Sequence, residues 1–349
     1  MELEQLIQQA AALGASDLHL AVGLPPKLRV DGSLTDLEGY PSLTDEDCQE
    51  LAAFLTGDQA QRLIRGGELD FSRTIAGTRI RGNLFRQQGH LSIALRLLSD
   101  TIPDLNTLGL PSAALEFPQL NRGIVLVTGE TGSGKSTTLA AVLQRINETR
   151  RKHIITLEDP IEYIHTPQQC LISQREIGSD TASYADGLRA VLREDPDIIL
   201  IGEMRDLTTI ETALTAAETG HLVFATLHTN SAADSIDRMV DVFPQGRQRQ
   251  IRMQLSMTLQ AVLSQQLLPH RVKGRVLACE LMVVNSAIRN LIREGKTPQI
   301  ANSLATSADQ GGITMDNSIL RLYRQRLISA QTACAAAHDP ERMKKAAVL

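Results

Sequence analysis

The sequence contains no tryptophan, and aromatic residues make up only 3% of its 349 residues. Proteins that bind single-stranded nucleic acid stack the bases on aromatic side chains, so this composition offers little surface for such binding. The formal net charge of −5 is also opposite in sign to the uniformly basic surface of a dedicated nucleic-acid binder, although it leaves room for a local basic patch. We therefore expect no nucleic-acid partner.

Cysteine is scarce: the chain has four cysteines, which stand far apart and form no Cys-x-x-Cys pair. This spacing favours reduced thiols in a hydrophobic core over a disulfide framework or a zinc site. We expect no structural metal at these residues, which are Cys48, Cys170, Cys279 and Cys334.

Long apolar runs are missing as well. No stretch approaches the roughly 20 apolar residues that cross a bilayer. Residues 1–7 are acidic where a signal peptide would be basic, so we expect a cytoplasmic protein. A chain of this length with 42% hydrophobic residues can bury two ordinary cores, and two domains are the default expectation.

Residues 1–100 favour an α+β domain. Short alternating segments bounded by turn residues predict a mainly antiparallel sheet, and helical segments predict cover for it. The expected strands are 16–20, 27–30, 69–75, 79–86 and 91–98, and the expected helices are 45–55 and 58–64.

A different pattern begins after residues 101–112, a segment with prolines and few charges that we predict to be a linker. In residues 113–349, short apolar runs alternate with helical segments, which is typical of a parallel sheet covered on both faces. We therefore expect an α/β nucleotide-binding domain with a helical C-terminal region. The expected strands are 124–127, 154–157, 198–201 and 222–225, and the clearest later helices are 247–266, 286–294 and 315–323.

The strongest motif is the glycine-rich sequence GETGSGKS at residues 129–136. Its glycines allow turns in which successive N–H groups point at phosphate oxygens, assisted by the N-terminus of the following helix. Lys135 would reach the β and γ phosphates of ATP, and Ser136 would ligate Mg²⁺. A chance match is disfavoured because a strand pattern precedes the loop and a helical pattern follows it. The predicted nucleotide-binding residues are Gly129, Thr131, Gly132, Ser133, Gly134, Lys135, Ser136 and Thr137.

Carboxylates follow the strand predicted at 154–157. Ligands of open parallel sheets lie beyond the carboxyl ends of the strands, so Glu158 and Glu162 could hold Mg²⁺ through water or orient the nucleophilic water. The alternative is that Asp159, Pro160 and Glu162 form a helix-capping signature. The sequence leaves both interpretations open.

A further carboxylate, Glu203, comes just after an apolar strand that we expect to neighbour the phosphate loop. This is the position of a Walker-B acid, so Glu203 is our preferred catalytic base. Gly202 stands where many ATPases carry an aspartate, which leaves metal coordination to Ser136, waters and residues 158–162. The alternative is that Glu203 only begins a loop while Asp206 caps the next helix.

Two histidines flank the strand predicted at 222–225. His228 follows the strand, where it could sense the γ-phosphate or relay its state to a neighbour. A lone histidine is more often a hydrogen-bonded structural residue, so this strand taken alone favours the structural interpretation. His221 precedes the strand at the opposite edge of the sheet, and we expect it to be structural.

Four segments resemble the Walker A, Asp-box, Walker B and His-box motifs of the secretion ATPases of type IV pili and type II secretion: 129–137, 154–163, 193–206 and 219–230. The resemblance is closer to the pilus-retraction branch, because residues 287–294 read AIRNLIRE and residues 14–20 resemble its N-terminal opening. It covers nearly the whole chain and weakens after about residue 299.

This resemblance implies a PAS-like N-terminal domain joined to a RecA-like P-loop ATPase core. It also implies a homo-hexameric ring at the cytoplasmic face of the inner membrane, where ATP hydrolysis turns a platform protein and drives pilin back into the membrane for twitching motility. ATP would bind between the two domains, with arginines of the N-terminal domain completing the site.

Strand alternation identifies the candidate arginines. It places Arg79, Arg81 and Asn83 on one face of their strand, and Arg96 recurs in the next strand. Guanidinium groups suit developing phosphoryl charge, so Arg81 and Arg96 are candidate arginine fingers, against the alternative of a solvated strand face. Gly82 stands where relatives often have a β-branched residue, and we expect it to loosen this strand.

Residues 287–294 taken alone predict an ordinary amphipathic helix, because apolar residues line one side and polar residues the other. The resemblance makes this helix a functional element that couples ATP turnover to retraction.

Rival functions remain open. An extension or secretion ATPase of the same family would usually carry a longer N-terminal region and a four-cysteine zinc module, and neither is present in this sequence. A nucleotide-gated ring would assemble on ATP without force-generating turnover, and a RecA-like nucleic-acid motor would be stimulated by single-stranded DNA. The divergent tail from residue 301 also leaves open an auxiliary paralogue of the retraction motor.

Overall fold

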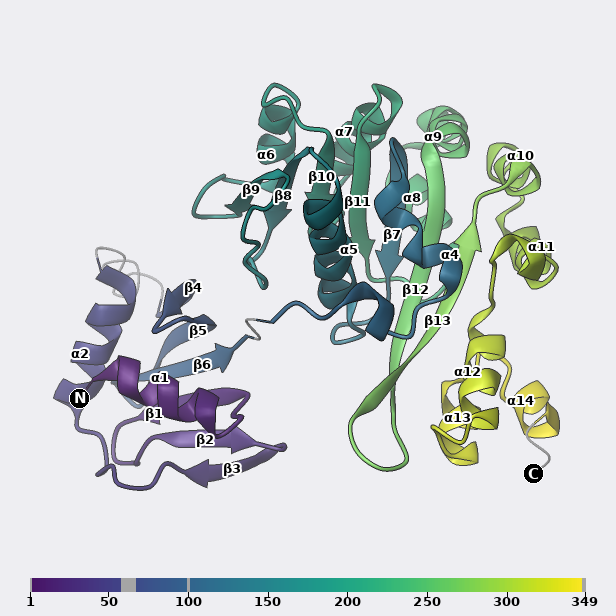
Figure 1. The fold of residues 1–349 in the computed structure, drawn as a ribbon. Coiled ribbons are helices and arrows are strands. Elements are labelled where there is room, and N and C mark those ends of the chain that lie inside the picture. Colours follow the sequence, from purple (N-terminus) through teal and green to yellow (C-terminus); the bar gives the residue numbers. More distant parts are fainter. Residues whose placement is uncertain (1, 58–66, 99–100, 347–349) are drawn as a thin grey trace. The chain divides into compact units, whose positions relative to one another are not determined.

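The computed structural model describes residues 2–57, 67–98 and 101–346 (Figure 1). The chain divides into two compact units: the first is Met1–Thr101 with Pro160–Ile164, and the second is Ile102–Asp159 with His165–Leu349. A short segment from the middle of the chain therefore joins the first unit. In the described part of the chain, no helix combines the length and the hydropathy that a membrane span requires.

The first unit is built on an antiparallel sheet with strand order β3-β2-β1-β6-β5-β4. Alternate residues of its central strands, such as Ile80 and Leu84, are fully buried, as the sequence pattern predicts. The expectation of an α+β domain is confirmed, although α1 and the exposed strand β3 are not among the predicted elements. The helix expected at 58–64 lies outside the described residues. The elements are α1 (Leu3–Ala12), β1 (Asp17–Ala21), β2 (Lys27–Val30), β3 (Ser33–Asp36), α2 (Asp45–Thr56), β4 (Glu68–Ile75), β5 (Thr78–Gln87) and β6 (His90–Leu97).

Gly82 is packed rather than loose. It pairs with Phe71 across strands β5 and β4. A Cβ at position 82 would lie 2.1 Å from Phe71 Cζ, so the ring already fills the place of a side chain. An aromatic ring that covers a glycine from the neighbouring strand compensates for the missing side chain. Our expectation that Gly82 loosens this strand is therefore wrong.

The second unit is built on a sheet with strand order β13-β12-β7-β11-β10-β8-β9. Every neighbouring pair is parallel except β12 with β13. The predicted parallel strands are confirmed, and β9, a half-buried edge strand with a polar sequence, is an addition to them. The strands are β7 (Gly123–Thr128), β8 (His153–Glu158), β9 (Leu171–Glu176), β10 (Ile198–Ile201), β11 (Leu222–Leu227), β12 (Leu259–Pro269) and β13 (Arg275–Val283).

Helices cover both faces of this sheet. Ile124 and Leu126 of β7 pack into one hydrophobic cluster with α6 to α10, whereas Val125 and Val127 pack into another with α5. This layered arrangement confirms the predicted RecA-like α/β core. The covering elements are η2 (Leu105–Thr107), α4 (Ser112–Leu115), η3 (Phe117–Gln119), α5 (Lys135–Thr149), α6 (Tyr184–Val191), α7 (Leu207–Glu218), α8 (Ala232–Asp241), α9 (Gln245–Thr258) and α10 (Ser286–Glu294).

The helix predicted at 247–266 is wrong in its second half. Helix α9 ends at Thr258, and the chain then enters β12. The residues of β12 include Leu, Ala and Gln, which have high helix propensity, but pairing with β7 and β13 overrides that preference. Figure 1 shows β12 and β13 as a long hairpin, which the sequence analysis does not predict.

The C-terminal helices pack on this hairpin through a small hydrophobic cluster that includes Leu268 and Ala278. Glu280 of β13 joins two parts of the unit: its buried carboxylate accepts hydrogen bonds from Ala232 N at 2.9 Å and Met315 N at 3.4 Å, the first residues of α8 and α12. Burial raises the pKa of this carboxyl above its ordinary value. The remaining elements are η4 (Thr297–Gln299), α11 (Ile300–Ala305), η5 (Ala308–Gln310), α12 (Met315–Arg324), α13 (Ala330–Ala336) and α14 (Pro340–Ala346).

Candidate nucleotide-binding site

The phosphate loop connects strand β7 to helix α5. Its three glycines have positive φ angles, 137° at Gly129, 80° at Gly132 and 93° at Gly134, which other residues rarely adopt. Gly134 is the N-cap of α5 and provides no side-chain cap. The first N–H groups of α5 are therefore available to an anion at the loop.

Lys135 lies within the loop. Its Nζ donates to the carbonyl oxygens of Gly129, at 2.7 Å, and Glu130, at 2.9 Å. This places a positive charge where phosphate oxygens would be bound, and the exposed hydroxyl of Ser136 suits a Mg²⁺ ligand. The other predicted side chains differ in burial: Ser133 is buried, Thr137 half-buried and Thr131 exposed. The residues present therefore fit a magnesium-bound nucleotide.

Strand β12 supports the loop. Ser264 Oγ accepts a hydrogen bond from Thr128 Oγ1 at 2.8 Å, and Gln265 Nε2 donates to Thr138 Oγ1 at 2.8 Å. A Cβ on Gly129 would lie 2.4 Å from Gln265 O, so only glycine allows this close approach. The strand that the sequence analysis predicts as a helix thus holds the phosphate loop in place.

Glu203 and His228 lie together at the carboxyl ends of β10 and β11. His228 Nε2 is 3.3 Å from Glu203 Oε1, and the Arg205 guanidinium is ion-paired with the same oxygen. The Glu203 side chain is only 19% exposed. The hydrogen bond that Arg205 Nε donates to Glu203 Oε1 raises the pKa of Arg205 above its ordinary value. His228 is therefore a neighbour of Glu203, and its functional role stays a prediction.

The strand of Glu203 is not the immediate neighbour of the loop's strand. Strand β11 pairs with both β7 and β10, so the expectation that strand 198–201 neighbours the loop is wrong. His228, at the end of β11, is the predicted residue on the strand next to the loop. Asp206 does cap α7, because its Oδ1 accepts a hydrogen bond from Thr209 N at 2.9 Å. The cap and the strand-end position of Glu203 therefore coexist.

Gly202 has no room for a side chain. A Cβ there would lie 2.9 Å from Tyr184 Oη, 3.0 Å from Leu157 O and 3.3 Å from Glu158 Cα. An aspartate at this position would push apart the ends of β8 and β10 or displace α6. Local packing thus accounts for the glycine where many ATPases carry an aspartate.

Tyr184, the first residue of α6, brings its hydroxyl to this cluster. Burial raises the pKa of the hydroxyl above its ordinary value, and the charges of Asp159, Glu203 and Glu158 raise it further. The hydroxyl therefore stays protonated as a hydrogen-bond donor among carboxylates. No motif marks a single tyrosine, and the Ser183 cap before it is a signal for the helix alone.

Glu158 ends β8, and two donors hold its carboxylate. Thr156 Oγ1 and Gln174 Nε2 both donate to Glu158 Oε1, at 2.6 and 3.2 Å. Within the described residues 159–164 no helix begins, so the capping interpretation of Asp159 and Glu162 is wrong. Glu158 belongs to the second unit and Glu162 to the first, and their shared role stays a prediction.

The two candidate arginine fingers lie side by side in the first unit. The antiparallel register pairs Arg81 of β5 with Arg96 of β6, and both are exposed. Arg96 Nε donates to Asp17 Oδ1 at 3.0 Å. Two guanidinium groups therefore share one face of the sheet, and their part in a nucleotide site stays a prediction.

Arg275 adds a cation that the sequence analysis misses. This first residue of β13 places its guanidinium 3.5 Å from Gly132 O in the phosphate loop. Guanidinium groups bind phosphate well, but the two residues are 143 positions apart, so no local pattern connects them.

Other residues singled out from the sequence make packing and hydrogen-bond contacts. His221 donates from Nδ1 to Ala216 O at 2.9 Å, as expected for a structural histidine. In α10, Ile288 and Ile292 are buried, and Arg289 donates to Ser256 O at 2.8 Å near the end of α9.

Among the described residues, no group of three or more potential ligands is arranged to hold a metal ion. Of the cysteines, Cys48, Cys170 and Cys279 are buried and Cys334 is half-buried, all as free thiols.

Comparison with known proteins identifies the family. Residues 2–333 match the family described as Type II/IV secretion system protein. The chain belongs to this family. This match confirms the resemblance to secretion ATPases that the motifs indicate.

Two relatives in this family serve type IV pili. The chain is 45% identical over 343 residues to the type IV pilus retractation ATPase PilT of Pseudomonas aeruginosa, covering 98% of this chain and 99% of the relative. It is 36% identical to the type IV pilus ATPase PilU of the same organism, covering 97% and 89%.

A solved structure of this family is similar throughout. The crystal structure of the pilus retraction motor PilT with bound ADP has 49% sequence identity and a TM-score of 0.93, covering 99% of each chain.

Proposed function

We propose that the protein is an ATP-hydrolysing motor that powers retraction of type IV pili for twitching motility. The observation that carries the proposal is its similarity to the pilus retraction motor PilT over almost the whole length of both chains. The phosphate loop and the carboxylates at the ends of β10 and β8 in the same sheet are groups of the kind that ATP hydrolysis requires.

In this proposal, residues 129–137 hold ATP, with Lys135 at the β and γ phosphates. Arg275, beside the loop, adds positive charge to the phosphate region. Ser136 would hold Mg²⁺, which neutralises charge on the phosphates when it is bound. ADP bound to the similar PilT supports a nucleotide at this loop.

Glu203 is the proposed general base. Glu203 follows β10, which β11 separates from the strand of the phosphate loop, and a carboxylate at this edge of the sheet can accept a proton from the attacking water. His228, 3.3 Å from its Oε1, would hold the carboxylate and report on the γ-phosphate. Glu158, and Glu162 from the first unit, would orient water around the metal.

We further propose that the chain works as a homo-hexameric ring at the cytoplasmic face of the inner membrane. The ring would turn a platform protein and drive pilin back into the membrane. Arg81 and Arg96 would complete the ATP site from the first unit, and the exposure of both side chains supports this role.

Deletion of the gene tests the function, with complementation by wild type, Lys135→Ala and Glu203→Ala. Retraction predicts that the deletion and both variants leave persistent or excess surface pili and no twitching motility. Surface pili are counted by microscopy, and motility is scored on agar.

Cells without pili would overturn the proposal in favour of an extension motor. Cells with unchanged pili and motility would point instead to an auxiliary paralogue of the retraction motor.

A further inference from the structure

The segment Pro160–Ile164 interrupts the second unit. It belongs to the first unit, where Ile161 is buried and its carbonyl oxygen accepts a hydrogen bond from Arg79 Nε at 3.0 Å. The chain therefore leaves the second unit directly after the Glu158-Asp159 pair and re-enters it at His165. The groups that bind the chain near residues 158 and 165 therefore fix both ends of this segment.

One side chain connects the two points. Gln174 of β9 pairs with Thr156 of β8. Its Oε1 accepts a hydrogen bond from His165 N at 2.9 Å, and its Nε2 donates to Glu158 Oε1 at 3.2 Å. Because a backbone N–H can only donate and an ionised carboxylate can only accept, these partners determine which end of the amide faces each of them.

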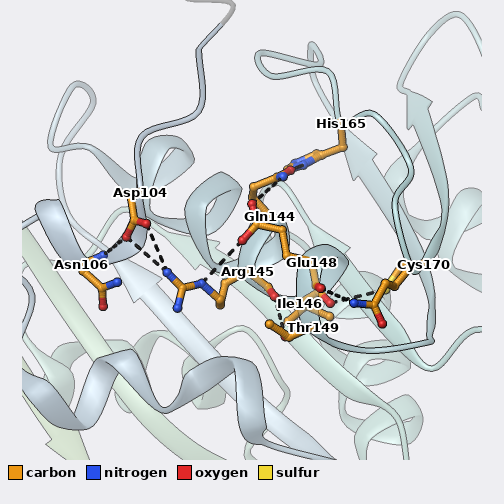
Figure 2. A network of polar contacts seen from close by, with 10 residues as sticks. Asp104, Asn106, Gln144, Arg145, Ile146, Glu148, Thr149, His165 and Cys170 are labelled. Atoms are coloured by element: carbon orange, nitrogen blue, oxygen red, sulfur yellow. Dashed lines mark hydrogen bonds and ion pairs between the residues drawn. The ribbon is translucent and has the colours of Figure 1, made fainter.

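The re-entry point is fixed on the helix that follows the phosphate loop. The buried His165 ring has its Nδ1 3.4 Å from Gln144 Oε1 of α5, and Figure 2 shows the two side chains facing each other. Asn147 of the same helix donates to Thr166 O at 2.8 Å and accepts from Gln168 N at 2.9 Å. The His165 N–H therefore has a defined position relative to α5.

We propose that Gln174 is a positioning residue that locks the Glu158 carboxylate to the helix of the phosphate loop through the His165 N–H. The inference rests on the proposed role of Glu158 in ATP hydrolysis. Gln174 acts through Glu158: its amide joins this carboxylate, beside the point where the chain leaves the second unit, to the His165 N–H at the point where the chain re-enters it.

Two substitutions test the acceptor and the donor of the Gln174 amide separately. Gln174→Met removes both hydrogen bonds, whereas Gln174→Glu keeps the acceptor for His165 N but replaces the donor to Glu158 by a like charge. At about pH 8 we expect each variant to lower kcat for ATP roughly tenfold, as for other groups that orient a functional ligand. We expect KM for ATP to change less than about twofold, because the phosphate loop is untouched.

The pH profile distinguishes positioning from a structural role. Protonation of the carboxyl in Gln174→Glu restores a donor toward Glu158, which Gln174→Met cannot do. The kcat ratio of Gln174→Glu to Gln174→Met should therefore rise as pH is lowered from about 8 to about 6. Wild-type kcat in Gln174→Glu at about pH 8, or a ratio that does not change with pH, overturns the inference.

Controls separate this inference from the proposed function. Glu158→Gln should lower kcat, and in its background Gln174→Met should add little further loss. If Glu158→Gln keeps wild-type kcat, the proposed role of Glu158 fails; if it loses kcat while both Gln174 variants keep theirs, only the positioning inference fails. Gln325→Glu is the matched control at an exposed position outside the site and should retain wild-type kcat. Circular dichroism and binding of a fluorescent ATP analogue check that every variant is folded.

Discussion

His165 makes the stability of the second unit depend on pH in a calculable way. Burial lowers the pKa of its imidazole from 6.5 to about 4. The unfolded chain therefore binds more protons than the folded chain between these two values. The stabilising contribution is complete above the unfolded pKa and is lost as pH falls through the folded pKa.

The magnitude follows from the shift. A fall of this size corresponds to roughly 3 kcal/mol of unfolding free energy at full effect, of which about 2 kcal/mol is lost by about pH 5. His165 is only 6% exposed, so solvent screens it little. We expect wild type to lose about 2 kcal/mol more stability than His165→Gln between about pH 8 and about pH 5.

Urea unfolding at the two pH values measures this difference. Because the chain has no tryptophan, far-UV circular dichroism at fixed protein concentration is the suitable signal. His338→Gln, at an exposed position, serves as the control and should follow wild type. An equal loss of stability in wild type and His165→Gln would refute the reasoning.

Two glycines give further predictions. Gly202→Ala brings a Cβ to 3.0 Å from Leu157 O, so we expect lower ATP turnover and a loss of about 1–3 kcal/mol of unfolding free energy. Adding Tyr184→Phe should not restore either quantity, because the backbone clash remains; full recovery in the double variant would contradict this explanation. Gly82→Val collides with the Phe71 ring and should lower the thermal midpoint of the first unit, which the added change Phe71→Ala should partly restore. Equal midpoints for the single and double variants would show that the ring does not fill the space.

Strong periodic patterns predicted most of the fold. Strand β10 and helix α10 match their predicted ranges, because buried apolar runs and amphipathic stripes are local signals. The hairpin of β12 and β13 was missed because its residues have helix-forming propensity and become strands only through pairing with β7. The weakly patterned β9 and β3 were missed because edge strands need not alternate between apolar and polar residues.

The candidate site is predictable in part, because some of its residues belong to local patterns. The phosphate loop is a contiguous motif, and the strand-end rule selected Glu203 and His228, which the structure brings to 3.3 Å of each other. Gln174 bonds Glu158, and Tyr184 brings its hydroxyl close to Gly202, from elements whose positions no local pattern gives. The capping interpretation at Asp159 failed because the chain there enters the first unit instead of starting a helix.

The most direct test of the account is a paired measurement of ATP binding and ATP hydrolysis by purified Glu203→Gln. Wild type should hydrolyse ATP, whereas Glu203→Gln should bind ATP with wild-type affinity and hydrolyse it at least roughly a hundredfold more slowly. Lys135→Ala is the comparison that should lose binding as well. Turnover by Glu203→Gln at the wild-type rate would contradict the account.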